Sequence, residues 1–180
     1  MKFAKVQPGT DWAKYHTVEL ATLRVPAEVR DGAPKGTRPG FGESYVLRDQ
    51  DVAALQDAYA GAMRDELGKA GFTFVTTPGP DTLIILGQIL NIQLTAPIES
   101  TRQTYTSRGA TFSRDAGSMA MGLVFGDGAS GQVIAEAADQ SVRDNVWGMN
   151  NRTTNLAEAK YAFRRWAAAI RERLVSARGS

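Results

Sequence analysis

A glycine-rich string at residues 126–131, with the sequence GDGASG, is the part of the chain whose spacing most resembles a chemical motif. Its glycines are spaced as in a dinucleotide-binding loop, which must join a strand to a helix because the helix N-terminus binds the pyrophosphate. Residues 132–138 instead have the pattern of a strand. Ser130 also lacks the glycine that a nucleophile elbow needs at position 132, where Gln132 stands. We therefore predict a β-hairpin turn.

Metal and acid–base chemistry have few candidate side chains in this sequence. The chain contains no cysteine and one histidine, His16. Disulfides and zinc–thiolate sites are therefore excluded, and a histidine pair would need a second copy of the chain. Asp65 and Glu66 are neighbours in a predicted helix, so their side chains point about 100° apart. We expect no cofactor and no metal site, and we expect that the protein is not an enzyme.

Basic side chains on the last predicted helix form the candidate partner-binding surface. At 100° per residue, four of them fall within about 40° of one another. This stripe could bind an acidic protein or lipid headgroups, or its side chains could cover the border of the helix's apolar face. We expect no nucleic-acid partner, because the aromatic residues of this helix belong to the apolar face and form no exposed stacking platform. The stripe consists of Lys160, Arg164, Arg171 and Arg178.

Composition and length indicate an ordinary globular chain. The protein has 180 residues, of which 43% are hydrophobic and 22% charged, values close to the averages for globular proteins. We expect one α+β domain over residues 1–180. The net charge is +2, with the basic residues concentrated after residue 147. The longest apolar stretch, residues 83–90, is far shorter than the roughly 20 residues that span a bilayer.

The elements that must position these residues follow from hydrophobic periodicity. We predict helices at 49–70, with Asp49 as the N-cap and Gly71 ending the helix, and at 155–174. We predict strands at 15–25, 72–76, 83–95, 118–125 and 132–138. The order β-α-β-β-β-β-α lacks a parallel βαβ alternation over most of the chain. We therefore predict a mostly antiparallel sheet with both helices packed on one face.

The structure of three further segments can be predicted from their residues. Residues 1–13 read as a loose segment, and residues 96–116 as a polar, mobile arm. The strand at 83–95 begins with four apolar residues in a row, which is typical of a strand covered on both faces. In its second half, Leu90, Ile92 and Leu94 should point to one face.

Five short motifs, in a fixed order, resemble those of a known family. They are a Pro-Gly opening, Glu-Leu before a Gly-aromatic pair, a Pro-Gly-Pro turn, an Asp-x-x-Ser-Gly turn with Asp139 on the return strand, and an Ala-Phe-x-x-Trp-Ala helix. The chain is similar, almost to Leu174, to a family of bacterial envelope lipoproteins known as domain of unknown function 3313. The matching residues are Pro8, Gly9, Asp11, Tyr15, Pro78, Gly79, Pro80, Asp127, Ser130, Gly131, Asp139, Phe163 and Trp166.

This resemblance implies a non-catalytic, periplasm-facing domain that a lipidated N-terminus anchors to the outer membrane. Its partner would be an envelope protein, peptidoglycan or lipid headgroups, and the motif residues would be mainly structural. The lipidated cysteine and its leader are missing, as expected of a chain that starts after them. The alternatives are a small-ligand carrier or hydrolase with a pocket near Trp147, between sheet and helices, and a cytoplasmic adaptor. The oligomeric state stays open.

Overall fold

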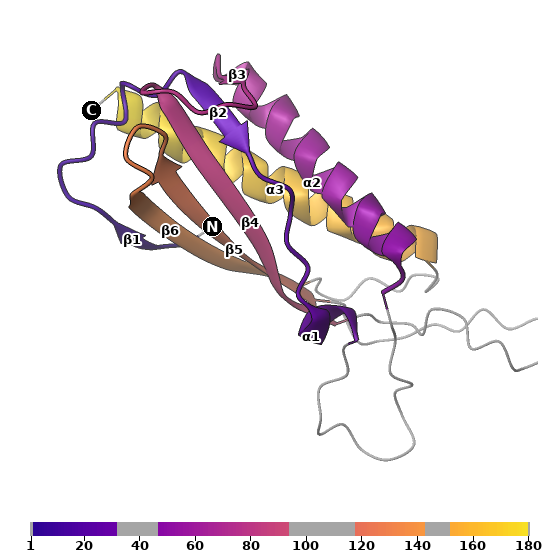
Figure 1. Ribbon diagram of the computed structural model, residues 1–180. Coiled ribbons are helices and arrows are strands. Elements are labelled where there is room, and N and C mark those ends of the chain that lie inside the picture. The colour runs from indigo at the N-terminus through magenta and orange to yellow at the C-terminus, as the bar shows by residue number, and fades with distance from the viewer. Residues whose placement is uncertain (1, 32–46, 94–117, 143–151, 180) are drawn as a thin grey trace, which may run out of the picture.

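Six strands form one sheet, and the two long helices lie side by side on one of its faces (Figure 1). The computed structural model describes residues 2–31, 47–93, 118–142 and 152–179. The prediction of a mostly antiparallel α+β sheet with both long helices on one face is confirmed. The strands are β1 (Lys2–Val6), β2 (Thr17–Leu20), β3 (Thr73–Phe74), β4 (Thr82–Gln93), β5 (Ser118–Asp127) and β6 (Val133–Val142), and the helices are α1 (Ala27–Arg30), α2 (Asp49–Lys69) and α3 (Arg152–Arg178).

The spatial order of the strands is β1-β6-β5-β4-β2-β3. Antiparallel pairs join β1 to β6, β6 to β5 and β5 to β4, whereas β2 runs parallel to both β3 and β4. The parallel pairs were not predicted. They arise because α2 carries the chain back along the sheet between β2 and β3, as a crossover between parallel strands requires.

The N-terminal segment differs from its prediction. Residues 1–13 were expected to be loose, but Lys2–Val6 forms the edge strand β1, paired with β6. This pairing is with residues more than a hundred positions away, so no local pattern indicates it. The predicted polar arm at 96–116 and the predicted pocket beside Trp147 lie outside the described residues.

Strand β4 lies between β5 and β2 and departs from two expectations. Its first half, residues 83–86, was expected to be covered on both faces, yet Leu86 is 44% exposed. Leu90 and Ile92 also do not share a face. A bulge between Ile89 and Asn91 shifts the register, so Ile89 and Ile92 are both buried while Leu90 is exposed.

Aromatic residues fill the space between the helices and the sheet. Phe163 of α3 makes edge-to-face contacts with Tyr59 of α2 and with Trp166, at ring-centroid distances of 5.8 Å and 6.0 Å. The Trp166 indole N–H donates to the Asp139 carboxylate across 3.2 Å. Burial raises the pKa of the Tyr59 hydroxyl, which lies above Gly87 of β4, where a Cβ would come within 2.7 Å of it. Close packing therefore requires glycine at this position.

Helix ends follow local capping rules, with shifts of a few residues. The N-cap of α2 is Arg48 rather than Asp49, and the Arg48 N–H donates to the Asp51 carboxylate across 3.0 Å. Gly71 ends the helix with a φ of 79°, as predicted. Helix α3 begins at Arg152, three residues before its predicted start. None of the helices in the described part of the chain is long and apolar enough to span a bilayer.

Candidate functional site

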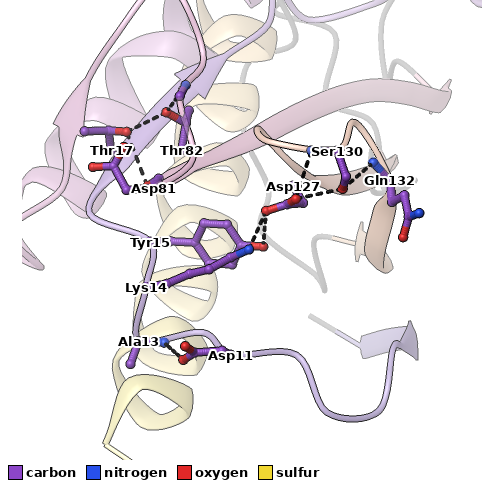
Figure 2. Close-up of polar contacts among 11 residues, drawn as sticks. Asp11, Ala13, Lys14, Tyr15, Thr17, Asp81, Thr82, Asp127, Ser130 and Gln132 are labelled. Carbon is purple, nitrogen blue, oxygen red and sulfur yellow. Dashed lines mark hydrogen bonds and ion pairs between the residues drawn. The ribbon is translucent and has the colours of Figure 1, made fainter.

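The densest polar cluster surrounds Asp127, the last residue of β5 (Figure 2). One carboxylate oxygen accepts hydrogen bonds from Lys14 Nζ at 2.7 Å and from the Tyr15 hydroxyl at 2.9 Å. The other accepts from the Ser130 backbone N–H at 3.0 Å and from the Ser130 hydroxyl at 2.7 Å. Asp127 is 7% exposed, and its two oxygens have four donors. We name these four residues the Asp127 brace.

The electrostatics of the brace fix its protonation. The hydrogen bond from Lys14, followed by those from Ser130, holds the pKa of Asp127 well below its ordinary value of 3.8. The same hydrogen bond to Asp127 raises the pKa of Lys14, and burial raises that of Tyr15. At neutral pH the brace therefore holds a carboxylate, an ammonium group and a neutral phenol.

This arrangement is unsuited to nucleophilic or general-base catalysis. A carboxylate with a strongly lowered pKa is a weak base. The Ser130 hydroxyl donates its proton to Asp127, and Lys14 is charged, so neither group is an activated nucleophile. The brace instead joins the segment before β2 to the turn after β5, two parts of the chain 113 residues apart.

A second group of contacts packs the turn before β4 against the hairpin turn. The buried Thr82 hydroxyl accepts from the Gly79 N–H and shares a hydrogen bond with the Thr17 hydroxyl, each at 2.7 Å. Gly128 approaches so closely that a Cβ would lie 2.5 Å from the Gly79 carbonyl oxygen. Gly131 has a φ of 70°. Glycine at 128 therefore allows the close approach of the two turns, and glycine at 131 allows the positive φ. The β-hairpin turn predicted for GDGASG is confirmed.

The family-motif residues gather in two places. Near the brace, Asp11 accepts a hydrogen bond from the Ala13 N–H at 3.0 Å, and Gly9 turns the chain with a φ of 76°. A separate group, in the helix-covered core, contains the indole–carboxylate contact between α3 and β6. Of the first group, Tyr15, Asp127 and Ser130 belong to the brace, Pro78, Gly79, Pro80 and Gly131 belong to the two turns that pack together, and Pro8, Gly9 and Asp11 lie in the segment before Lys14. The second group is Asp139, Phe163 and Trp166.

Sequence reasoning missed two residues of this polar region, Lys14 and Thr82. No local spacing indicates either residue, because each has its partner on a different element. Lys14 and Asp127 are 113 positions apart, and Thr82 and Thr17 are 65 positions apart.

The predicted basic stripe divides into two halves. Lys160 and Arg164 are exposed. Arg171 instead forms an ion pair with Glu66 of α2, with 2.9 Å between Nη1 and Oε2. Arg178 is also used within the chain, as described next. The stripe therefore does not present four free cations, because its second half contacts other residues of the same chain.

Arg178 connects the end of α3 to the segment before β2 and to the segment between α2 and β3. Its guanidinium lies 3.9 Å from the centroid of the Phe72 ring and donates to the carbonyl oxygens of Ala70, at 3.2 Å, and Tyr15. Burial lowers the pKa of Arg178, and the contacts with π-electrons and carbonyl dipoles suit the charged form.

The exposed half of the stripe belongs to a larger basic surface. Arg165 is exposed beside it, and Tyr161 is 67% exposed. We name Lys160, Tyr161, Arg164 and Arg165 the α3 basic patch. None of its three cations forms an ion pair with another described residue.

Metal-binding groups are absent from the described part of the chain. No three side chains of the His, Cys, Asp and Glu types converge there. His16 is exposed, and its backbone N–H donates to the Asp81 carbonyl oxygen at 3.0 Å. Its described contacts are therefore those of a residue next to a strand.

The fold and the site together define an α+β domain. A mixed sheet carries two long helices on one face and the Asp127 brace at one end. The sequence matches the family described as "Protein of unknown function (DUF3313)" over residues 3–170, and the chain belongs to this family. Among curated proteins, none matches the sequence.

Solved structures share the fold at low sequence identity. A crystal structure of an uncharacterized protein has a TM-score of 0.53 and 10% identity, covering 88% of this chain and 91% of that chain. Protein XCC0632 from Xanthomonas campestris has a TM-score of 0.50 and 14% identity, covering 93% and 88%. A minor lipoprotein from Acinetobacter baumannii has a TM-score of 0.46 and 10% identity, covering 90% and 94%. We take the fold alone from the first two.

Proposed function

We propose that this chain is a non-catalytic, periplasm-facing binding domain of a bacterial envelope lipoprotein, anchored to the outer membrane through a lipidated N-terminus. The resemblance of the sequence motifs to those of a family of bacterial envelope lipoproteins supports the location. The absence of catalysis is supported by the Asp127 brace, whose carboxylate, ammonium and hydroxyl groups bind one another.

One observation carries the binding role. The polar groups of the brace are occupied within the chain, whereas the α3 basic patch presents three cations and an exposed tyrosine without a described ion-pair partner. Clustered positive charge attracts anionic surfaces, and arginine forms paired hydrogen bonds with carboxylate and phosphate groups. The patch therefore suits an anionic envelope partner: an envelope protein, peptidoglycan or lipid headgroups.

The first test is the location of the full-length protein in its own cell. Fractionation is combined with metabolic labelling of the native N-terminus with a fatty acid. Labelled protein in the outer-membrane fraction is the expected result. Unlabelled protein in the cytosol would overturn the lipoprotein assignment, and the cytoplasmic-adaptor alternative would then take its place.

The second test addresses the α3 basic patch with two charge reversals on one helix. Arg164→Glu changes the patch, whereas Arg173→Glu makes the same change at an exposed residue nine positions away, about 180° around the helix. Binding is measured by flotation with anionic and neutral vesicles, by co-sedimentation with peptidoglycan and by crosslinking in cells. We expect Arg164→Glu alone to weaken one of these interactions. Equal effects of the two variants, or none, would overturn the patch.

A further inference from the structure

The two long helices cover different halves of the sheet. They lie side by side on one face (Figure 1). Helix α3 reaches β6, where Trp166 donates to Asp139. Helix α2 reaches β4, where Tyr59 lies above Gly87. In the strand order, β6 lies towards the β1 edge and β4 towards the β2–β3 edge. The two helices therefore mark opposite halves of the domain.

The two helices have net charges of opposite sign. Helix α3 contains seven basic and two acidic residues, a net charge of +5. Helix α2 contains five acidic and two basic residues, a net charge of −3. The strands change this little, because β1 and β6 together carry two lysines and two acids, and Glu19 adds one acid in β2. Charge therefore separates across the width of the sheet.

The exposed side of α3 has a line of apolar residues between its cations. Tyr161, Ala168 and Val175 recur every seven residues, so they fall within about 40° of one another on the helix. Tyr161 is 67% exposed and Val175 is 50% exposed. The cations of the α3 basic patch lie on both sides of this line. Apolar side chains flanked by basic ones are typical of a helix that lies on a membrane surface.

The two acidic residues of α3 leave this side of the helix basic. Glu172 accepts a hydrogen bond from Arg171 at 3.4 Å, and Arg171 is also paired with Glu66 of α2. Glu158 is half-buried. The three cations of the patch form no ion pair with another residue of the described ranges. Their charge is therefore available to a partner.

We propose that the α3 basic patch binds the surface of an anionic lipid bilayer, with phosphate headgroups as its ligands. This inference rests on the proposed function and names one of the three partners given there. A surface of negative charges attracts α3 and repels α2, so the domain lies with α3 against the lipid and α2 turned away. Arg164 and Arg165 pair with phosphate oxygens, and Tyr161 lies among the headgroups.

The charge separation favours a lipid surface over the other two partners. A protein or a glycan strand that contacts only the patch interacts with a few cations, and the charge of α2 has no part in that contact. A bilayer is an extended surface, and its potential reaches about 10 Å into a solution of 0.1 M salt. It therefore acts on both helices and orients the whole domain. The exposed apolar line also suits the boundary between headgroups and acyl chains.

Flotation of the full chain with lipid vesicles tests the proposal. We expect binding to vesicles that contain phosphatidylglycerol and none to vesicles of phosphatidylcholine alone. Because salt screens exposed charges, raising its concentration from about 0.1 M to about 0.5 M should release the protein. A chain that floats with neither kind of vesicle, or equally with both, would overturn the proposal.

Substitutions in the patch measure its contribution to vesicle binding. Arg164→Gln should lower the partition coefficient about fivefold, the factor expected for one basic residue near an anionic surface, and Arg164→Glu should lower it further. Tyr161→Ser should lower it about threefold, because part of the ring leaves water on binding. Arg173→Glu, on the opposite side of the helix, is the control and should have a smaller effect than Arg164→Glu. All three residues are exposed, so circular dichroism should show unchanged folding. Equal effects of the two reversals would contradict the proposal.

Single cysteines identify the side of the domain that meets the lipid, because the chain has no native cysteine. An environment-sensitive fluorophore is attached to Val175→Cys on α3, to Ala53→Cys on α2, or to Leu86→Cys on the face of the sheet opposite the helices, the open face. All three positions are exposed. With anionic vesicles, we expect a blue shift in emission at position 175 alone. A shift at position 53 would overturn the orientation, and a shift at position 86 alone would assign the lipid contact to the open face.

The outcomes separate this inference from the proposed function. Suppose that Arg164→Glu weakens binding to peptidoglycan or crosslinking to an envelope protein, while the chain binds no vesicle. The lipid partner is then wrong and the proposed function stands. If Arg164→Glu changes none of these interactions, the patch fails in both roles. Vesicle binding that Arg164→Glu weakens more than Arg173→Glu, with the emission shift at position 175, supports both.

Discussion

The two faces of the sheet have similar apolar residues but opposite surroundings. On β4, Leu83, Ile85 and Ile89 point to the helices and are fully buried, whereas Leu86 and Leu90 on the other face are about half exposed. Neighbours along one strand therefore differ in exposure although they do not differ in hydrophobicity. The comparison teaches that apolar character favours burial of a residue, but the position of the helices decides which face of the strand is buried.

The largest expected effect comes from the helix-covered face. Trp166→Ala removes a 1% exposed side chain that contacts Phe163 and donates to Asp139. We expect a loss of about 3–5 kcal/mol in the free energy of unfolding, measured by urea denaturation. Leu86→Ala on the open face is the comparison and should cost about 1 kcal/mol or less. Similar losses at both positions would contradict the difference between the faces.

Substitution of Asp127 tests whether polar contacts at the end of the sheet contribute as much to stability as the core does. Asp127→Asn removes the charge and replaces one accepting oxygen by an N–H donor, so the bonds from Lys14 or Ser130 are lost. We expect a loss of about 2–3 kcal/mol in unfolding free energy. Asp81→Asn, at an exposed carboxylate nearby, should change it little. A neutral Asp127→Asn would remove the brace's role in stability.

The pH dependence of the unfolding free energy tests whether the charge of Asp127 is the cause of this stabilisation. The folded-state pKa of Asp127 is lowered from 3.8, so the unfolded chain takes up a proton at higher pH than the folded one. The stabilisation by the ionised carboxylate is therefore present above about pH 4 and falls as the pH drops below that value. We expect the difference in unfolding free energy between the wild type and Asp127→Asn to shrink from pH 6 to pH 3. A constant difference would show that charge is not the cause.

The smallest effect is expected at the end of α3. Arg178→Ala removes the contact with Phe72 and the hydrogen bonds to Ala70 and Tyr15. We expect a loss of about 1–2 kcal/mol in unfolding free energy. Arg173→Ala, at an exposed arginine of the same helix, should cost about 0.5 kcal/mol or less. Equal costs would mean that the contacts of Arg178 with Phe72, Ala70 and Tyr15 do not stabilise the fold.

Local signals predicted the parts of the fold that depend on neighbours in sequence. The hairpin followed from alternation around a glycine-rich turn, and Gly71 was correctly placed at the end of α2. Helical spacing placed Arg164 and Arg171 on one stripe, yet it could not separate their contacts. That separation depends on Glu66, which lies on another helix.

The amino-acid sequence by itself determined the family, the α+β class, the two amphipathic helices and the hairpin, because periodicity and turn chemistry act over a few residues. Only the tertiary structure decided that Lys14 meets Asp127 and that β2 runs parallel to β4. These contacts join residues about 65 or more positions apart. Their partners are selected by the packing of the whole chain, which no local pattern encodes.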